Sequence, residues 1–341
     1  MKLIQSLDER KIMTKTIRWG IIGTGNIAHQ FARGLSGVDG STLVAVASRT
    51  KDAADKFADE FNVTQRHVGV AEIAGNAAVD VIYVATPHPF HKDNTLQCLN
   101  GGKAVLCEKP FALNLQEATE MIQVARAKGL FLMEAIWTLF YPAMAKVREI
   151  VTSGAIGTVQ LLQSNFCFRA GWNPESRLLS PELGGGALLD VGIYNVALAR
   201  MIFGRDPSRI NSMAHLGETG VDELSSLILG YDDGAMAVLT SAIRTNTSNA
   251  AVIYGTDGYI KIPHMFWKPH AIVVKAGQSS EETITFDSTG NGYNYEVEEV
   301  ARCLRSGALE SNIVPLDTTL SNMKILDCCR EQWGLVYPME K

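Results

Sequence analysis

The sequence has little that would direct the protein to a membrane or to nucleic acid. No apolar run reaches the ~18 residues of a membrane span, and the first eleven residues are too polar for a signal-peptide core. Lys and Arg total 31 against 36 Asp and Glu, a net charge of −5 without a basic stripe. We therefore expect a cytoplasmic protein with a small-molecule substrate and no nucleic-acid or membrane partner.

Cysteine is also scarce. The six cysteines show no paired metal-ligand spacing, which favours buried, reduced thiols over a disulfide framework. His88 and His91 are close in sequence, but no acid at a matching spacing accompanies them. The sequence therefore predicts no metal site.

What the sequence does have is material for a large core. Hydrophobic residues make up 46% and charged residues 20% of 341 residues, as in an ordinary globular protein long enough for two domains. Residues 1–15 precede the first strand and are interpreted as an N-terminal extension. We predict a dinucleotide-binding domain over 16–137 and a second domain over 138–341.

The first domain shows an alternation of strands and helices. Apolar runs without polar alternation are typical of parallel strands buried on both faces. They occur at residues 17–22, 43–47, 79–84, 104–107 and 130–133. Helix-patterned segments, such as 52–61 and 115–128, lie between them. The alternation predicts an α/β fold, with an N-terminal Rossmann domain built on a parallel sheet.

The pattern changes after Trp137. Helices are expected at 142–151 and 187–203, with a strand between them at 158–168. Turn signals of hairpin type then separate several β-rich segments. These segments are 209–215, 225–231, 235–242, 249–254 and 271–275, and helices at 295–305 and 317–333 close the chain. A C-terminal α/β domain with a mostly antiparallel sheet is therefore predicted.

The segment Gly23-Thr24-Gly25-Asn26-Ile27-Ala28 follows the first strand and opens a helix. In a dinucleotide fingerprint, the position of Gly23 permits the tight turn, that of Gly25 lets the backbone approach the pyrophosphate, and that of Ala28 lets the helix pack against the strand. The free N–H groups of the helix attract the anion. Asn26 and Ile27 belong to the same predicted cofactor site.

The end of the second strand indicates which dinucleotide binds. It reads Ala47-Ser48-Arg49-Thr50, without the acid that usually binds the ribose of NAD. Ser48 can hydrogen-bond a 2′-phosphate and Arg49 can pair with it, although Arg49 could also be a solvated surface residue. NADP is therefore predicted over NAD.

Three further segments resemble one known family. These are Thr86-Pro87-x-x-x-His91, Glu108-Lys109-Pro110 and the run 185–194, which contains Asp190 and Tyr194. Together with the glycine-rich turn they resemble the glucose–fructose oxidoreductase/inositol dehydrogenase family (Gfo/Idh/MocA). The runs 102–110, 130–138 and 185–194 are most similar to its branch of dimeric dihydrodiol dehydrogenases and NADP-dependent D-xylose dehydrogenases.

The resemblance implies an open second sheet that mediates a homodimer, and reversible hydride transfer at a sugar or cyclic-polyol carbon. It places Thr86, Pro87, His88, His91, Glu108 and Lys109 around the cofactor. His88 stands where relatives often have Asn. A cis bond before Pro110 is also expected from relatives.

Lys109, Asp190 and Tyr194 are the predicted catalytic residues. Lys109 follows a parallel strand at its carboxyl end, where open α/β sheets bind ligands. Asp190 and Tyr194 are four residues apart, so they share one face of a helix. Many relatives have His at the position of Tyr194. A tyrosine can perform the same proton transfer if a cation such as Lys109 lowers its pKa. Which of the two gives up the proton stays open.

Four aromatic or basic residues are candidates for the substrate pocket, namely Trp137, Phe168, Arg169 and Trp172. The leading hypothesis is an NADP-dependent dehydrogenase of an aldose or a cyclic trans-diol. A reductase of a dicarbonyl or an anhydro-sugar is an alternative, because hydride transfer is reversible. A regulator that binds NADP(H) without turnover is the other, although the catalytic residues are all present.

Overall fold

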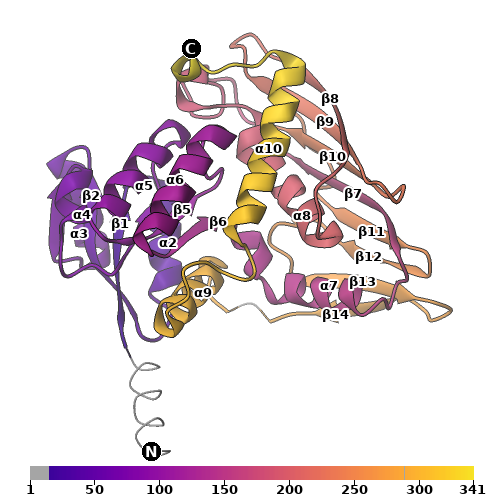
Figure 1. Ribbon diagram of the computed structural model, residues 1–341, viewed down its shortest axis with the longest axis horizontal. Coiled ribbons are helices and arrows are strands. Elements are labelled where there is room, and N and C mark those ends of the chain that lie inside the picture. The colour runs from indigo at the N-terminus through magenta and orange to yellow at the C-terminus, as the bar shows by residue number, and fades with distance from the viewer. Residues whose placement is uncertain (1–14, 288) are drawn as a thin grey trace, which may run out of the picture.

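The computed structural model describes residues 15–287 and 289–341, so residues 1–14 of the predicted extension lie outside the described part. Two sheets form the framework of the molecule (Figure 1). The smaller sheet belongs to the N-terminal half of the chain, and the larger one belongs to the C-terminal half. A continuous set of buried apolar side chains fills the layers between sheets and helices.

The first sheet has six parallel strands in the order β3-β2-β1-β4-β5-β6. Its strands are β1 (Ile17–Ile22), β2 (Ser41–Ser48), β3 (Gln65–Val68), β4 (Val81–Val84), β5 (Ala104–Glu108) and β6 (Leu132–Ala135). The helices of this half are α2 (Asn26–Leu35), α3 (Lys51–Phe61), α4 (Val70–Ala74), α5 (His91–Asn100) and α6 (Leu115–Lys128). β1 and β4 are adjacent although two strands separate them in sequence, so the strand order reverses at this point. Ligands bind beyond the strand ends at such a reversal.

The second sheet has eight strands in the order β14-β13-β12-β11-β7-β10-β9-β8. Only the pairing of β7 with β10 is parallel. Its strands are β7 (Val159–Cys167), β8 (Arg209–Leu216), β9 (Asp222–Gly230), β10 (Met236–Ala242), β11 (Ala251–Gly255), β12 (Gly258–Ile262), β13 (Ala271–Ala276) and β14 (Glu282–Thr285). The helices of this half are α7 (Pro142–Thr152), α8 (Ile193–Phe203), α9 (Tyr293–Ser306) and α10 (Leu316–Trp333). Figure 1 shows α7, α8 and α10 on the side of the sheet that faces the first domain.

The predicted fold class is confirmed, with a parallel Rossmann sheet and a mostly antiparallel second sheet. The strands β3, β12 and β14 were not predicted from the sequence. The strand β3 reads Gln-Arg-His-Val and β14 reads Glu-Thr-Ile-Thr, and both are edge strands. Edge strands face water along one side and need few apolar residues, so they lack the apolar run on which the prediction relied.

The predicted helix over 187–203 begins with a π-helical turn, Leu188–Gly192, before α8. Among the described residues, the segment Pro181–Phe203 is long and apolar enough to cross a membrane, a length that the sequence analysis did not anticipate. However, 83% of its most apolar stretch is buried inside the protein. It packs in the core against β7 and β10.

The last two long helices contact both halves of the chain. α9 packs on α2 of the Rossmann domain, and α10 packs on α6 and β6 as well as on α8 and β8. Figure 1 shows α10 running between the two sheets. The C-terminal helices therefore hold the two halves at a fixed separation, which positions any site between them.

Asp222, which contacts the start of the 188–203 segment, makes the stability of the protein depend on pH. Asp222 is fully buried, and its carboxylate accepts a hydrogen bond of 2.7 Å from the Leu188 backbone N–H. Burial raises the pKa of Asp222 to about 7. In the unfolded chain, the pKa of Asp222 is about 3.9. Between about pH 4 and pH 7, the native state therefore binds one proton more at Asp222 than the unfolded state does. The stabilising effect of that proton is complete below this window and is lost as the pH rises through it, at about 1.4 kcal/mol per pH unit.

Asp222→Asn removes this titration and keeps an oxygen for the Leu188 N–H. We expect the variant to gain stability relative to the wild type as the pH rises from 5.5 to 7.5, measured as the difference in thermal unfolding midpoint. Exposed Asp232→Asn is the matched control and should show no such trend. A constant difference between Asp222→Asn and the wild type at all pH values contradicts the assignment.

Candidate active site

The glycine-rich turn between β1 and α2 has the backbone that a dinucleotide needs. Gly23 has φ +101°, and a Cβ on it would lie 2.6 Å from the Ala85 carbonyl oxygen. A Cβ on Gly25 would meet only open space. Gly25 caps α2 without a side-chain hydrogen bond to the first turn, and Ala28 is fully buried. The turn therefore presents free backbone N–H groups to an open space, as an anion at a helix N-terminus requires.

A cavity of about 670 Å³ lies over this turn. Its lining includes every predicted cofactor residue except buried Ala28, namely Gly23, Gly25, Asn26, Ile27, Ser48, Arg49, Thr86, Pro87, His88, His91, Glu108 and Lys109. Arg49 is exposed and makes no hydrogen bond or ion pair with any described residue. The Ser48 hydroxyl lies 3.3 Å from that of Thr24. The residues present therefore fit a bound dinucleotide.

His88 and His91 fix the loop after β4. The His88 Nδ1 lies 2.9 Å from the Gly184 carbonyl oxygen, and burial, with His91 and Lys109 nearby, lowers its pKa to about 3. His88 is therefore neutral and donates from Nδ1. His91 Nδ1 and Nε2 lie 2.8 and 2.7 Å from the carbonyl oxygens of Pro110 and Thr86. Both histidines position backbone, and His88 connects the cofactor loop to the second domain.

The Glu108-Lys109-Pro110 segment leaves β5 at the same edge of the sheet. The Lys109–Pro110 bond is cis. The Glu108 carboxylate is buried, accepts a hydrogen bond from the Tyr83 hydroxyl and lies 3.1 Å from the Lys109 backbone N. Burial raises the pKa of Glu108, although Lys109 opposes this effect. Glu108 thus anchors the backbone from which the Lys109 side chain extends.

Lys109 and buried Asp190 form a partly buried ion pair between the two domains. The Lys109 Nζ lies 2.7 Å from the Asp190 carbonyl oxygen and 3.2 Å from its Oδ1. Arg177 donates from Nη1 to the same Oδ1 at 2.8 Å. Burial alone would raise the pKa of Asp190, but Lys109 and Arg177 hold it well below its usual range. Asp190 is therefore a carboxylate that fixes two cations at one point.

Tyr194 lies next to this ion pair. The Lys109 Nζ is 5.1 Å from the centre of its ring, and the Trp137 indole N–H donates to its hydroxyl oxygen at 2.9 Å. Because the Tyr194 oxygen accepts this hydrogen bond from Trp137, the Tyr194 O–H can donate its proton to a different acceptor. Burial raises the pKa of Tyr194 well above its ordinary value, and the nearby Glu108 adds to the effect. Tyr194 is thus a protonated phenol, and the expected lowering of its pKa by Lys109 does not appear.

A second cavity, of about 460 Å³, opens beside Tyr194. Aromatic side chains dominate its wall, and Lys109, Arg177, Asp190 and Tyr194 supply polar groups. The aromatic residues of the lining are Trp137, Phe166, Phe168, Tyr194, Trp267 and Tyr293. Two of the predicted substrate residues, Trp137 and Phe168, line this cavity. Arg169 and Trp172 are exposed and are not part of this lining.

Several residues of the site were not predicted from the sequence. Arg177 is in a loop without a motif, and its ion pair with Asp190 is apparent only in the tertiary structure. Trp267 comes from the loop between β12 and β13 and stacks on Phe166 with ring centres 3.5 Å apart. No signal in the sequence places that loop against β7. Within the described residues, no group of three or more His, Cys, Asp or Glu could hold a metal ion.

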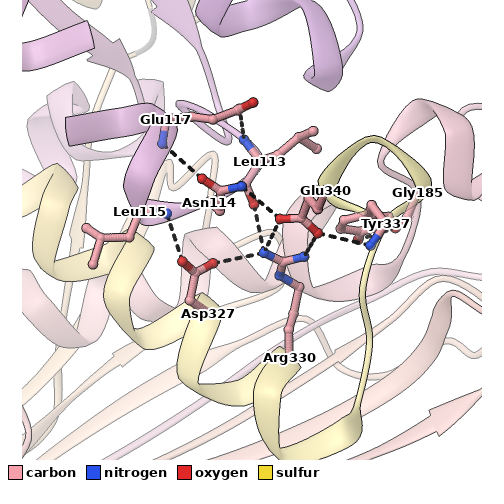
Figure 2. Close-up of polar contacts among 9 residues, drawn as sticks. All are labelled: Leu113, Asn114, Leu115, Glu117, Gly185, Asp327, Arg330, Tyr337 and Glu340. Carbon is pink, nitrogen blue, oxygen red and sulfur yellow. Dashed lines mark hydrogen bonds and ion pairs between the residues drawn. The ribbon is translucent and has the colours of Figure 1, made fainter. Parts of the chain in front are cut away.

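The C-terminal segment holds both loops that carry the catalytic candidates. Figure 2 shows Arg330 of α10 between the carboxylates of Asp327 and Glu340. Its guanidinium also donates to the Leu113 carbonyl, a few residues after Lys109, at 3.2 Å. The Tyr337 hydroxyl donates to the Gly185 carbonyl, a few residues before Asp190, at 2.6 Å. This cluster ties together the two chain segments that bring Lys109 and Asp190 into contact.

In this Rossmann domain the dinucleotide cavity meets a second cavity at Lys109, and an aspartate and a tyrosine line the second cavity. This arrangement defines a nicotinamide-dependent oxidoreductase. Residues 17–136 match the oxidoreductase family with an NAD-binding Rossmann fold, and residues 144–261 match the GFO/IDH/MocA C-terminal domain. The chain belongs to the Gfo/Idh/MocA family of oxidoreductases.

Curated relatives cover nearly the whole chain. The trans-1,2-dihydrobenzene-1,2-diol dehydrogenase of Mus musculus is 38% identical over 95% of this chain and 99% of its own length. The enzyme of the same name from Xenopus laevis is 39% identical over 94% and 99%, respectively.

Two solved structures share the fold at 24% identity. The aldose-aldose oxidoreductase from Caulobacter crescentus has a TM-score of 0.86 and covers 94% of this chain and 98% of its own. The 3-ketoreductase KijD10 from Actinomadura kijaniata, in complex with NADP and TDP-benzene, has a TM-score of 0.82 and covers 93% and 98%.

Proposed function

We propose that the protein is an NADP-dependent dehydrogenase of a CH–OH group in a cyclic trans-diol or a sugar, with Lys109 and Tyr194 as a proton relay. The Lys109 Nζ lies beside Asp190 and over the ring of Tyr194, at the junction of the two cavities, and this arrangement carries the proposal. The curated relatives named for a dihydrobenzene-diol support the substrate class. When bound, the nicotinamide supplies or accepts the hydride.

The hydrogen bonds of Tyr194 support a role in proton transfer. Since Trp137 donates to the phenol oxygen, the Tyr194 O–H can donate to an oxygen of the substrate. Reduction of a carbonyl needs this proton at the oxygen, and oxidation of an alcohol needs Tyr194 or Lys109 to take it back. Lys109, fixed by Asp190, stabilises negative charge on the same oxygen. A raised pKa of Tyr194 should therefore make oxidation faster as the pH increases, while reduction tolerates neutral pH.

Substrate oxidation and reduction with purified protein test the proposal. We expect NADP reduction with trans-dihydrodiols or aldoses, followed by absorbance of NADPH. Turnover only in the reverse direction, with dicarbonyls or anhydro-sugars, would replace the proposal with the reductase alternative. Tight NADP(H) binding without turnover of any substrate in either direction would favour a regulator and overturn both enzymatic functions.

The outer face of the second sheet supports a homodimer. Alternate side chains of β8, β9 and β10 point away from α8 and α10. They include four exposed apolar residues, Met213, Leu224, Ile228 and Met236, with Met213 78% exposed, and exposed Ser226 lies among them. We call these residues the outer patch. Contiguous exposed apolar patches mark association sites. We propose that a second copy of the chain covers this patch.

Light scattering after gel filtration tests the dimer. We expect twice the mass of the chain for the wild type and one chain mass for Ile228→Lys, because a charge in the patch would be buried without a partner. Lys324→Ala on α10 is a control outside the patch. A monomeric wild type, or a dimer unaffected by Ile228→Lys, contradicts the proposed interface.

A further inference from the structure

The position of Arg177 separates it from the other residues of the site. Of the residues that the structure describes, only Ile27, Lys109 and Arg177 line both cavities, and Arg177 alone of these comes from the second domain. It lies in the loop between β7 and the short helix Pro181–Leu183, and its side chain is 56% exposed. Ligands in either cavity would therefore meet its guanidinium.

Most of the hydrogen-bonding capacity of Arg177 is unused. A guanidinium has five N–H donors in a planar fork. One of them, on Nη1, donates to Asp190 Oδ1, and the other four make no hydrogen bond with a described residue. The ion pair with Asp190 holds the guanidinium at one nitrogen, so the remaining donors stay beside the junction of the two cavities. An arginine fixed in this way is preorganised for a ligand oxygen.

The Lys109 Nζ and the Arg177 Nη1 contact the same oxygen, Asp190 Oδ1, at 3.2 and 2.8 Å. Donors that share one acceptor are close neighbours. A substrate whose reacting oxygen lies at Lys109 and Tyr194 would hold an oxygen on the adjacent carbon close to Arg177. Two oxygens on neighbouring carbons are what a vicinal diol, or its hydroxyketone product, offers.

We propose that Arg177 is the residue that selects vicinal diols, by donating to the substrate oxygen next to the carbon that is oxidised. This inference rests on the proposed function and assigns a residue to its substrate class. The aromatic wall of the second cavity packs against the ring of the substrate, and Arg177 donates a hydrogen bond to its second oxygen. A cyclic alcohol with one hydroxyl group has no second oxygen to accept from Arg177, so the donors of Arg177 stay hydrogen-bonded to water.

Arg177→Met tests the proposal, because it removes the donors and keeps most of the length of the side chain. The kcat/KM values for trans-cyclohexane-1,2-diol and for cyclohexanol are compared in the wild type and the variant. We expect a loss of roughly 10- to 100-fold for the diol and less than about threefold for the alcohol, as for a lost hydrogen bond to a charged group. If cyclohexanol turns over too slowly, its inhibition constant against the diol replaces its kcat/KM. Arg126→Met, on the outer surface beside Asp317, is the matched control and should change neither value.

An equal loss for both substrates would assign Arg177 to positioning of Asp190 and would overturn the proposal, as would no loss at all. A larger loss for a sugar acid than for the diol would assign the fork to a carboxylate and overturn it as well. Arg177→Lys, which keeps a donor, should recover part of the preference for the diol. The ratio of the kcat/KM values for the two substrates does not respond to partial unfolding, because both values fall with the amount of folded enzyme. Turnover by the wild type tests the proposed function separately.

Discussion

Replacing Lys109 with Met should lower kcat by about two orders of magnitude or more and leave the affinity for NADP(H) nearly unchanged. The side chain contacts Asp190 and the face of Tyr194, so its loss removes the cation at the reacting oxygen. General acid–base groups contribute about 10²- to 10⁴-fold. Asp190 keeps its ion pair with Arg177, so the buried carboxylate is not left unpaired and the fold should persist.

Steady-state kinetics give kcat, and quenching of protein fluorescence by NADPH gives the cofactor affinity. Lys146→Met removes a lysine of a surface ion pair with Glu149 and is the matched control. An unchanged kcat in Lys109→Met would remove Lys109 from the relay. Tyr194 would then be the remaining candidate for the proton transfer.

Replacing Arg49 with Ala should weaken NADP binding by about 10- to 100-fold and change NAD binding little. Arg49 lines the dinucleotide cavity, is exposed, and has no protein partner among the described residues. Only NADP carries the 2′-phosphate, and a hydrogen bond to a charged group contributes about 1.5–3 kcal/mol. The change in preference should therefore come almost entirely from NADP.

Dissociation constants for both cofactors, measured by calorimetry, check this prediction. Arg33→Ala, an exposed arginine of α2 paired with Glu60, is the control variant. A similar loss for NADP and NAD would mean that Arg49 is a general surface cation. A dominant preference for NAD in the wild type would contradict the choice of NADP itself.

The sequence was sufficient where a short segment carries its own physical constraint. Gly23 needs a positive φ and a close approach to Ala85, which only glycine tolerates, and such a position is visible as a motif. Buried parallel strands such as β1 and β4 need continuous apolar residues, so they were predicted close to their bounds. The α/β class, the two sheets and the family follow from these local patterns.

The relations between distant segments were decided by the tertiary structure. Lys109 and Asp190 are 81 residues apart in the sequence. They form an ion pair because both domains pack against α10. The high pKa of Tyr194 comes from burial beside Glu108 and not from its neighbours in sequence. Arg177 has no motif, because its place in the site depends on one contact with the Asp190 carboxylate, 13 residues further along the chain. Local chemistry is encoded in local sequence, whereas burial and the meeting of charges depend on how the whole chain packs.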